Sequence, residues 1–111
     1  MDLPYRRFGR TNLKMPVLSL GGMRFQQSWN HLDSSEISNK QRKKVDTLLS
    51  LANKYGFNHI ETAFHYGTSE IELGFAIDTS YRKSIILQTK IPPNKNLFFS
   101  MSSLNFQFFT N

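Results

Sequence analysis

The sequence predicts an α/β fold that begins with a β-hairpin and continues as alternating strands and helices. Short apolar runs over residues 17–20, 57–60 and 84–91 alternate with segments in which apolar residues recur every three or four positions, over 40–55 and from 69 onward. This alternation is typical of βα units with a parallel sheet. A turn-forming cluster near the amino terminus, with an extended run on either side, adds the hairpin.

The hairpin is expected at the amino terminus. Gly9-Arg10-Thr11-Asn12 is rich in residues that favour turns, and the runs 5–8 and 13–15 flank it. Pro16 is expected to break the hairpin from the first strand of the sheet, residues 17–20.

Residues 40–55 have the clearest helical pattern, and Gly56 follows at the position of a C-cap. The apolar stripe of this helix is Val45, Leu48, Leu49, Ala52 and Tyr55. A second helix is expected to begin at Ser69, because Ser69 and Glu72 have the spacing of a capping box. Its buried stripe is Leu73, Ala76 and Ile77.

The third strand, residues 84–91, is apolar and β-branched enough to be buried on both faces, as parallel strands are. The polar segment 24–39 is expected to be a loop at the edge of the sheet where a site forms. Trp29 in this loop fits either of two roles, lining a ligand pocket or resting on the rim of the fold. His31 has no ligand-spaced partner and is expected to face solvent.

Composition argues against several classes of protein. The 111 residues include no cysteine, so there is neither a disulfide framework nor a zinc-finger spacing. No apolar run approaches the roughly 18 to 20 residues that span a bilayer. The net charge of +6 comes from scattered basic residues without interleaved aromatic residues. We therefore expect a cytoplasmic protein that binds no nucleic acid, membrane or metal.

Three polar side chains are placed to meet at one edge of the sheet. Glu61 ends the second apolar run, Tyr66 lies five residues further on in the expected loop, and Lys90 follows the third run. If these runs are neighbouring parallel strands, all three side chains reach the carboxyl-terminal edge, where α/β folds place their sites. Taken singly, each has a plainer explanation: a surface acid, a loop aromatic and an exposed lysine.

Four linked segments resemble the amino-terminal part of the aldo-keto reductases in order and spacing, from about Pro4 to Ile91. They are Tyr5-Arg6-Arg7-Phe8-Gly9-Arg10-Thr11, Met15-Pro16-Val17-Leu18-Ser19-Leu20-Gly21-Gly22-Met23, Glu61-Thr62-Ala63 with Tyr66-Gly67 and Ser69-Glu70, and Thr89-Lys90. The resemblance implies the first part of a TIM, or (β/α)8, barrel: a hairpin that closes its amino-terminal end and about three βα units. A complete barrel takes roughly 250 residues or more, so we expect an incomplete one.

The resemblance also implies an oxidoreductase that moves a hydride between NADP(H) and a small carbonyl substrate. In the family a tyrosine protonates the carbonyl oxygen, a lysine stabilises the resulting phenolate, and an acid keeps the lysine charged and in place. Tyr66, Lys90 and Glu61 match these positions, with glutamate where most members have aspartate. The histidine that orients the carbonyl in the family has no counterpart in this sequence.

By the same resemblance, Gly21, Gly22 and Met23 occupy the segment beside the ribose and ring of the nicotinamide. The alternative for the two glycines is an ordinary turn, since glycine permits positive φ and close approach of other groups to the backbone.

The character of the sequence changes after Pro92-Pro93. Residues 94–111 contain one lysine, no acid and five of the ten phenylalanines. We expect residues 1–95 to be an amino-terminal fragment of an aldo-keto reductase barrel and residues 96–111 to be a divergent tail. Such a chain is expected to be inactive as it stands. The alternative is a non-catalytic partial barrel that binds a partner, or that self-associates through exposed strand edges.

Overall fold

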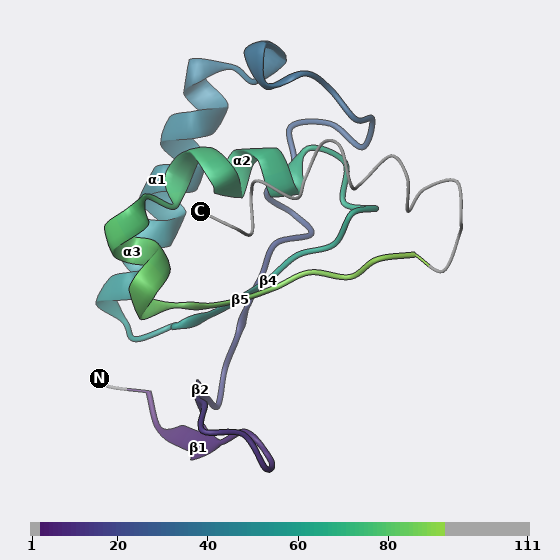
Figure 1. The fold of residues 1–111 in the computed structure, drawn as a ribbon. Coiled ribbons are helices and arrows are strands. Elements are labelled where there is room, and N and C mark those ends of the chain that lie inside the picture. Colours follow the sequence, from purple (N-terminus) through teal and green to yellow (C-terminus); the bar gives the residue numbers. More distant parts are fainter. Residues whose placement is uncertain (1–2, 93–111) are drawn as a thin grey trace.

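The computed structural model describes residues 3–92, in which a hairpin precedes a chain of βα units (Figure 1). The hairpin is formed by β1 (Tyr5–Arg7) and β2 (Lys14–Pro16). The elements that follow are β3 (Leu20–Gly21), a short 3-10 turn (Ser34–Glu36), α1 (Asn39–Lys54), β4 (His59–Glu61), α2 (Ser69–Ala76), α3 (Thr79–Ser84) and β5 (Ile86–Gln88). The expected boundary at residue 95 and the tail 96–111 lie outside the described residues.

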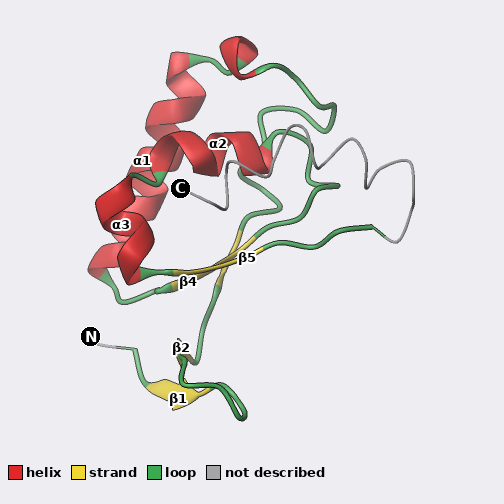
Figure 2. Ribbon diagram, in the orientation of Figure 1, coloured by secondary structure: helices red, strands yellow, loops and turns green. Residues whose placement is uncertain are grey.

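The three strands of the main sheet are parallel and lie in the order β3-β4-β5. Ile60 in β4 is paired with Leu20 on one side and with Leu87 on the other. The three helices lie on one side of this sheet (Figure 2). The predicted α/β fold with parallel βα units is therefore confirmed.

The hydrophobic core fills the space between the sheet and the helices. Its buried members are Phe25, Val45, Leu49, Ile60, Leu73 and Ile85. Because successive side chains of a strand point to opposite faces, Ile60 faces this core while His59 and Glu61 lie on the other face. The face that carries the candidate site is thus the one opposite the helices.

Helix α1 forms within one residue of its predicted ends, and Gly56 follows it as predicted. The side chain of Ser38 accepts a hydrogen bond from the backbone N–H of Gln41 at 3.2 Å, and Gly56 has a φ of +84° just beyond the helix. Of the predicted stripe, Val45, Leu49 and Ala52 are buried and Leu48 packs against the core. Tyr55 is an exception at 48% exposed, because it is the C-cap residue and no longer follows the helical stripe.

The predicted hairpin forms and lies against the loop that precedes β4. The hydroxyl of Tyr5 donates to the carbonyl of Gly56, and Asn58 Nδ2 donates to the carbonyl of Lys14 at 3.3 Å. Pro16 is the last residue of β2, opposite Tyr5, and β3 begins only at Leu20, so the hairpin and the first strand of the sheet are separate, as predicted. A proline is tolerated there because the next ladder bond runs from the N–H of Val17 to the carbonyl of Pro4, at 3.0 Å, which makes Tyr5–Pro16 a pair whose N–H groups point away from the partner strand.

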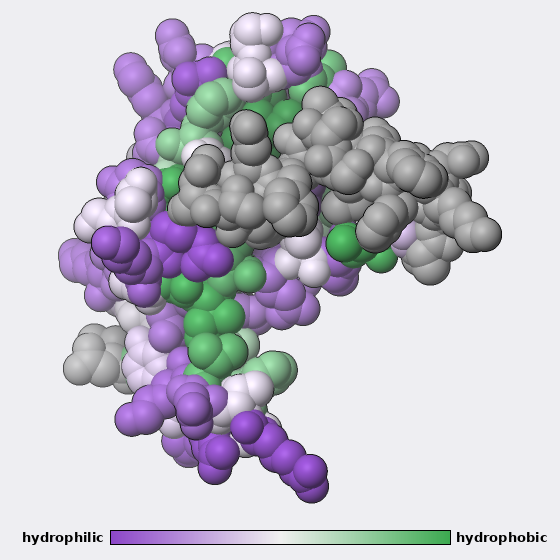
Figure 3. Space-filling view, in the orientation of Figure 1, coloured by the Kyte–Doolittle hydropathy of each residue, from purple (hydrophilic) through white to green (hydrophobic). Residues whose placement is uncertain are grey.

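The first strand of the sheet is shorter and begins later than predicted. Val17 and Leu18, which were expected to belong to it, are 50% and 56% exposed and precede β3. The ladder begins only at Leu20 because β4, its partner, extends only over His59–Glu61. Figure 3 shows hydrophobic surface between the hairpin and the helical layer, the two parts that this segment joins.

The third strand also differs from the prediction, because it is not buried on both faces. Ile86 and Leu87 are half-buried and Gln88 is exposed. Within residues 3–92 no strand pairs with the outer edge of β5, which accounts for this exposure. The strand begins after an unpredicted short helix, α3, in which the Asp78 side chain caps the backbone N–H of Tyr81 at 2.7 Å.

Helix α2 begins at Ser69 as predicted, but the capping box does not form. Thr68 occupies the N-cap position and its side chain makes no capping hydrogen bond. Glu72 instead accepts a hydrogen bond from the hydroxyl of Thr68 at 3.1 Å. None of the helices within residues 3–92 is long and apolar enough to cross a membrane.

Candidate active site

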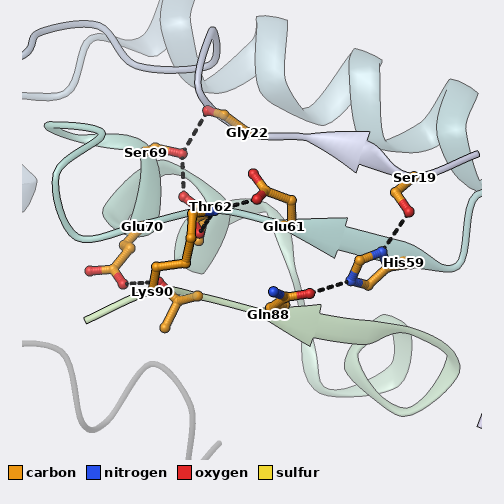
Figure 4. A network of polar contacts seen from close by, with 10 residues as sticks. Ser19, Gly22, His59, Glu61, Thr62, Ser69, Glu70, Gln88 and Lys90 are labelled. Atoms are coloured by element: carbon orange, nitrogen blue, oxygen red, sulfur yellow. Dashed lines mark hydrogen bonds and ion pairs between the residues drawn. The ribbon is translucent and has the colours of Figure 1, made fainter. Parts of the chain in front are cut away.

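An ion pair between Glu61 and Lys90 joins the carboxyl-terminal ends of β4 and β5 (Figure 4). Glu61 is the last residue of β4, and Lys90 lies two residues beyond β5. The hydrogen bonding between the strands continues beyond β4 and β5 as far as Lys90, because the N–H of Phe64 donates to the carbonyl of Lys90 at 3.2 Å. The Lys90 ammonium donates to Glu61 Oε2 and, at 3.0 Å, to the carbonyl oxygen of Thr62. A glutamate at this position therefore reaches the lysine.

The surroundings of Lys90 favour its charged form. Partial burial works to lower the pKa of Lys90, but hydrogen bonding to Glu61 and Tyr66 and the charges of these two groups raise it above the ordinary value of a lysine. Its side chain is 44% exposed, so solvent still reaches the ammonium. Lys90 is therefore a cation that can stabilise a negative charge on a group beside it.

Tyr66 completes the cluster from the loop between β4 and α2. The Lys90 ammonium nitrogen lies 4.9 Å from the centroid of the Tyr66 ring, within the range of a cation–π contact. Tyr66 is half-buried. The structure thus brings Glu61, Tyr66 and Lys90 together at the carboxyl-terminal edge of the sheet.

The segment that carries Tyr66 is held by the loop that follows β3. Gly67 has a φ of +57°, and a Cβ placed on it would lie 1.9 Å from the carbonyl oxygen of Ser28. Beside this contact, the N–H of Thr68 donates to the Ser28 carbonyl at 3.0 Å, and the N–H of Gln27 donates to Thr68 Oγ1 at 3.0 Å. Glycine is required after Tyr66 because both the backbone conformation and the packing exclude a side chain.

The segment expected to hold a cofactor, Gly21 to Met23, follows β3 on the other side of Glu61. A Cβ on Gly22 would lie 2.9 Å from the backbone oxygen of Glu61, so close packing of the chain already explains this glycine. Gly21, which is paired with Glu61, has nothing within 4 Å of such a Cβ, and Met23 is 39% exposed. Gly21 and Met23 therefore offer open surface beside the ion pair.

Sequence reasoning assigned no role to three hydrogen bonds made by the first turn of α2. The hydroxyl of Ser69 donates to the carbonyl of Gly22 at 2.9 Å and lies 2.8 Å from Thr62 Oγ1. The carboxylate of Glu70 accepts a hydrogen bond from the hydroxyl of Thr89 at 2.7 Å. Burial raises the pKa of Glu70 above its ordinary value, although the hydrogen bond from Thr89 works against this shift.

His59 forms a second polar layer below the ion pair, and sequence reasoning missed it. Its Nδ1 lies 2.7 Å from Ser19 Oγ and its Nε2 lies 3.0 Å from Gln88 Oε1, so the ring connects the segments of all three strands. The alternation of side chains places His59 on the same face as Glu61, two residues away. The alternation of side chains along the strand could therefore have predicted that His59 lies on the same face as Glu61.

The two loop residues singled out in the sequence lie near this edge. His31 is exposed, as predicted, and its ring stacks on the buried Phe64 with centroids 4.5 Å apart. Trp29 is 55% exposed. Its role as a pocket wall stays a prediction.

Comparison with known families agrees with this geometry. The sequence model described as the aldo/keto reductase family matches residues 17–106, which is most of the chain. The chain belongs to the aldo-keto reductase family. The matched range extends beyond Lys95, near which we expected the resemblance to end.

Solved structures of aldo-keto reductases have the same fold as this chain. Two structures from Pseudomonas aeruginosa, both assigned to the aldo-keto reductases, are 31% and 30% identical to it, with TM-scores of 0.63 and 0.62. Each alignment covers 78% of this chain, and 32% and 30% of the respective relatives. A thermostable aldo-keto reductase in complex with the inhibitor epalrestat is 23% identical, with a TM-score of 0.74 over 98% of this chain and 39% of its own.

The chain therefore spans between 30% and 39% of the length of these three relatives. A search of curated proteins gave no match.

Proposed function

We propose that this chain carries the proton-transfer residues of an NADP(H)-dependent oxidoreductase that interconverts a carbonyl compound and an alcohol. The observation that supports this proposal is the position of the Lys90 ammonium, which is bonded to Glu61 and lies 4.9 Å from the ring centroid of Tyr66. A general acid beside a fixed cation is what carbonyl reduction requires, because the carbonyl oxygen must gain a proton as the carbon is reduced.

In the proposed mechanism, Tyr66 gives its hydroxyl proton to the carbonyl oxygen of the substrate. The phenolate that remains is stabilised by the charge of Lys90, whose pKa is raised by Glu61 and Tyr66 despite the opposing effect of burial. Glu61 and the carbonyl of Thr62 hold the ammonium in place. In the reverse direction the same phenolate accepts the proton of the alcohol.

The cofactor segment fits a flat ligand at two of its three predicted residues. Gly21 leaves open space where a side chain would stand and Met23 is partly exposed, whereas Gly22 is packed against β4 and Ser69. NADPH, when bound, supplies the hydride that reduces the carbonyl carbon. Gly21 and Met23 would lie against the nicotinamide end of the cofactor. Gly22 would hold these two residues next to Glu61, because the N–H of Gly22 donates to the Glu61 carbonyl at 2.7 Å.

We further propose that these 111 residues alone do not turn over substrate. The described sheet has three strands, whereas a TIM barrel closes with eight and fills its interior with side chains from all of them. Net stability is normally only about 5 to 15 kcal/mol, so a sheet without most of its interior is expected to be poorly stable.

The test joins residues 1–91 of this chain to the remaining strands and helices of one Pseudomonas aeruginosa relative. We expect the chimera to oxidise NADPH in the presence of a reactive aldehyde, and the 111-residue chain to show no activity above its Tyr66→Phe variant. In the chimera, Tyr66→Phe and Lys90→Met are each expected to reduce kcat by about 100-fold or more. A chimera that folds and binds NADPH, yet loses nothing when Tyr66 is changed, would contradict the assignment of Tyr66 as the acid.

A second function is favoured by the open edges of the sheet. Within residues 3–92 neither β3 nor β5 has a neighbour on its outer side, and such edges recruit other chains. We propose as the alternative a non-catalytic partial barrel that self-associates or binds a partner through these edges. Sedimentation of the purified chain distinguishes the two: a stable dimer of defined mass without NADPH binding favours the alternative, and a monomer counts against it.

A further inference from the structure

One turn of helix α2 makes side-chain hydrogen bonds to the ends of all three strands of the sheet. Ser69 Oγ donates its hydrogen to the carbonyl of Gly22, which follows β3. Because that hydrogen is used, the contact between Ser69 and Thr62, which follows β4, has the Thr62 hydroxyl as donor. Glu70 accepts from the hydroxyl of Thr89, which follows β5. Figure 4 shows these contacts beside the Glu61–Lys90 pair.

The residues that make these contacts in α2 and directly after β4 are buried. Thr62 and Ser69 are 0% exposed and Glu70 is 4% exposed. A buried polar group that loses its partner pays the cost of desolvation without compensation, so such hydrogen bonds fix the relative position of the groups that they join. Nothing in the proton-transfer mechanism uses the side chains of these residues.

Each strand end that α2 contacts is adjacent in sequence to a residue of the site. Thr62 follows Glu61, and its backbone carbonyl also accepts a hydrogen bond from Lys90 at 3.0 Å. Thr89 precedes Lys90, and Gly22 follows Gly21. A displacement of α2 would therefore act on the backbone next to both Glu61 and Lys90.

We propose that Ser69 and Glu70 are positioning residues, which set the geometry of the Glu61–Lys90 pair by fixing Gly22, Thr62 and Thr89 to the first turn of α2. This role rests on the proposed function, because the pair matters to catalysis only if Tyr66 is the acid. It is tested by a property of Lys90 that requires neither turnover nor cofactor.

The experiment is competitive acetylation of the full 111-residue chain with trace acetic anhydride, quantified by mass spectrometry at each lysine. Acetylation requires the neutral amine, so the ion pair protects Lys90 relative to Lys40, an exposed lysine of α1 that serves as internal reference. Labelling is done in the cold with sucrose, an excluded osmolyte that favours the folded state, and again in denaturant. Hydrogen exchange of the Leu49 amide, in the buried part of α1, reports whether the fold persists.

Thr89→Val and Ser69→Ala each remove one of these hydroxyls. We expect each to raise the acetylation of Lys90 relative to Lys40 by roughly two- to tenfold, the factor that one hydrogen bond of ordinary strength is worth. Thr89→Ser keeps the hydroxyl, and Glu70→Gln keeps an acceptor oxygen, so both are expected to retain the wild-type ratio. Thr47→Val is the matched control, because it removes a hydroxyl that bonds only to the backbone of α1 at 2.9 Å.

Three results would overturn the proposal. Thr89→Val and Ser69→Ala could leave the Lys90 ratio at the wild-type value while the chain remains folded. Lys90 and the Leu49 amide could lose protection together in these variants, which would mean that the contacts hold the fold and not the lysine. A wild-type ratio equal to that in denaturant would show that the ion pair does not form in solution. The chimera's turnover remains a separate measurement, so failure of the positioning role and failure of the proposed function are distinguishable.

Discussion

Replacement of Gly67 by alanine isolates the packing that places Tyr66. Two costs are expected at this position. An alanine held at a φ of +57° costs about 1–2 kcal/mol, the ordinary penalty of the left-handed conformation. Its Cβ would also lie 1.9 Å from the carbonyl oxygen and 2.8 Å from the carbonyl carbon of Ser28, and these are backbone atoms that a rotamer change cannot move.

The loop must therefore shift and give up two hydrogen bonds between Ser28 and Thr68. The N–H of Thr68 donates to the Ser28 carbonyl at 3.0 Å, and the N–H of Ser28 donates to Thr68 Oγ1 at 3.2 Å. At about 0.5–1.5 kcal/mol for each bond, the packing cost is about 1–3 kcal/mol beyond the cost of φ. Gly67→Ala is thus expected to destabilise the chain by about 2–5 kcal/mol in total.

Gly9→Ala provides the matched control. Gly9 has the same φ of +57°, but nothing lies within 4 Å of a Cβ placed there. It is expected to cost only the conformational term of about 1–2 kcal/mol. Urea unfolding in the cold, with sucrose present to favour the folded state, gives both free energies by circular dichroism. The fluorescence of Trp29, the single tryptophan, reports displacement of the loop. Equal losses in the two variants, with unchanged Trp29 emission, would refute the inferred role of packing at Gly67.

Three further predictions concern the core, a buried acid and the ion pair. Leu73→Ala, at a fully buried residue, is expected to cost about 2–5 kcal/mol in urea unfolding, and Leu51→Ala, at a residue 46% exposed in α1, clearly less. Burial raises the pKa of Glu72 above 4.5, so its contribution to stability is present below the unfolded value and is lost as pH rises through the folded value. The Tm of Glu72→Gln should therefore rise relative to wild type with increasing pH, and a constant difference would contradict this. Acetylation of Lys90 should increase in the order wild type, Glu61→Asp, Glu61→Gln. The shorter acid loosens the ion pair, and the amide removes the negative charge. Unchanged acetylation of Lys90 in Glu61→Gln would contradict the pairing.

The elements predicted best are those whose signals are local. The helix predicted over residues 40–55 from its apolar stripe and from Gly56 lies at residues 39–54. The convergence of Glu61, Tyr66 and Lys90 followed from two apolar runs and one intervening helix, because parallel neighbouring strands must end at one edge. Both predictions depend on spacing along the chain and on little else.

The elements predicted poorly depend on partners elsewhere in the chain. Val17 and Leu18 have the composition of a strand, but a strand exists only where another lies opposite, and β4 has no residue there to pair with them. Ser69 and Glu72 have the spacing of a capping box, but the N-cap position is taken by Thr68. Ser69 is already inside the helix, and its hydroxyl donates to Gly22 on another element. Local patterns list the bonds that a side chain is able to make, and tertiary packing selects among them.

The polar layer around His59 shows why the face of the sheet opposite the helices escaped prediction. In sequence, His59 interrupts an apolar run and has no partner nearby, whereas in the sheet its ring lies between Ser19 and Gln88, with 6% of its surface exposed. The strand order β3-β4-β5 makes these contacts possible, because it places Ser19 on one side of β4 and Gln88 on the other. In sequence these residues are 40 and 29 positions away from His59. Two residues further on, the same face carries Glu61 and its ion pair with Lys90. Successive layers of this face are therefore joined by polar contacts between strands, and a register slip of one residue would turn both His59 and Glu61 toward the apolar core. The cost of burying an unpaired charge there specifies the register, and with it the position of the site.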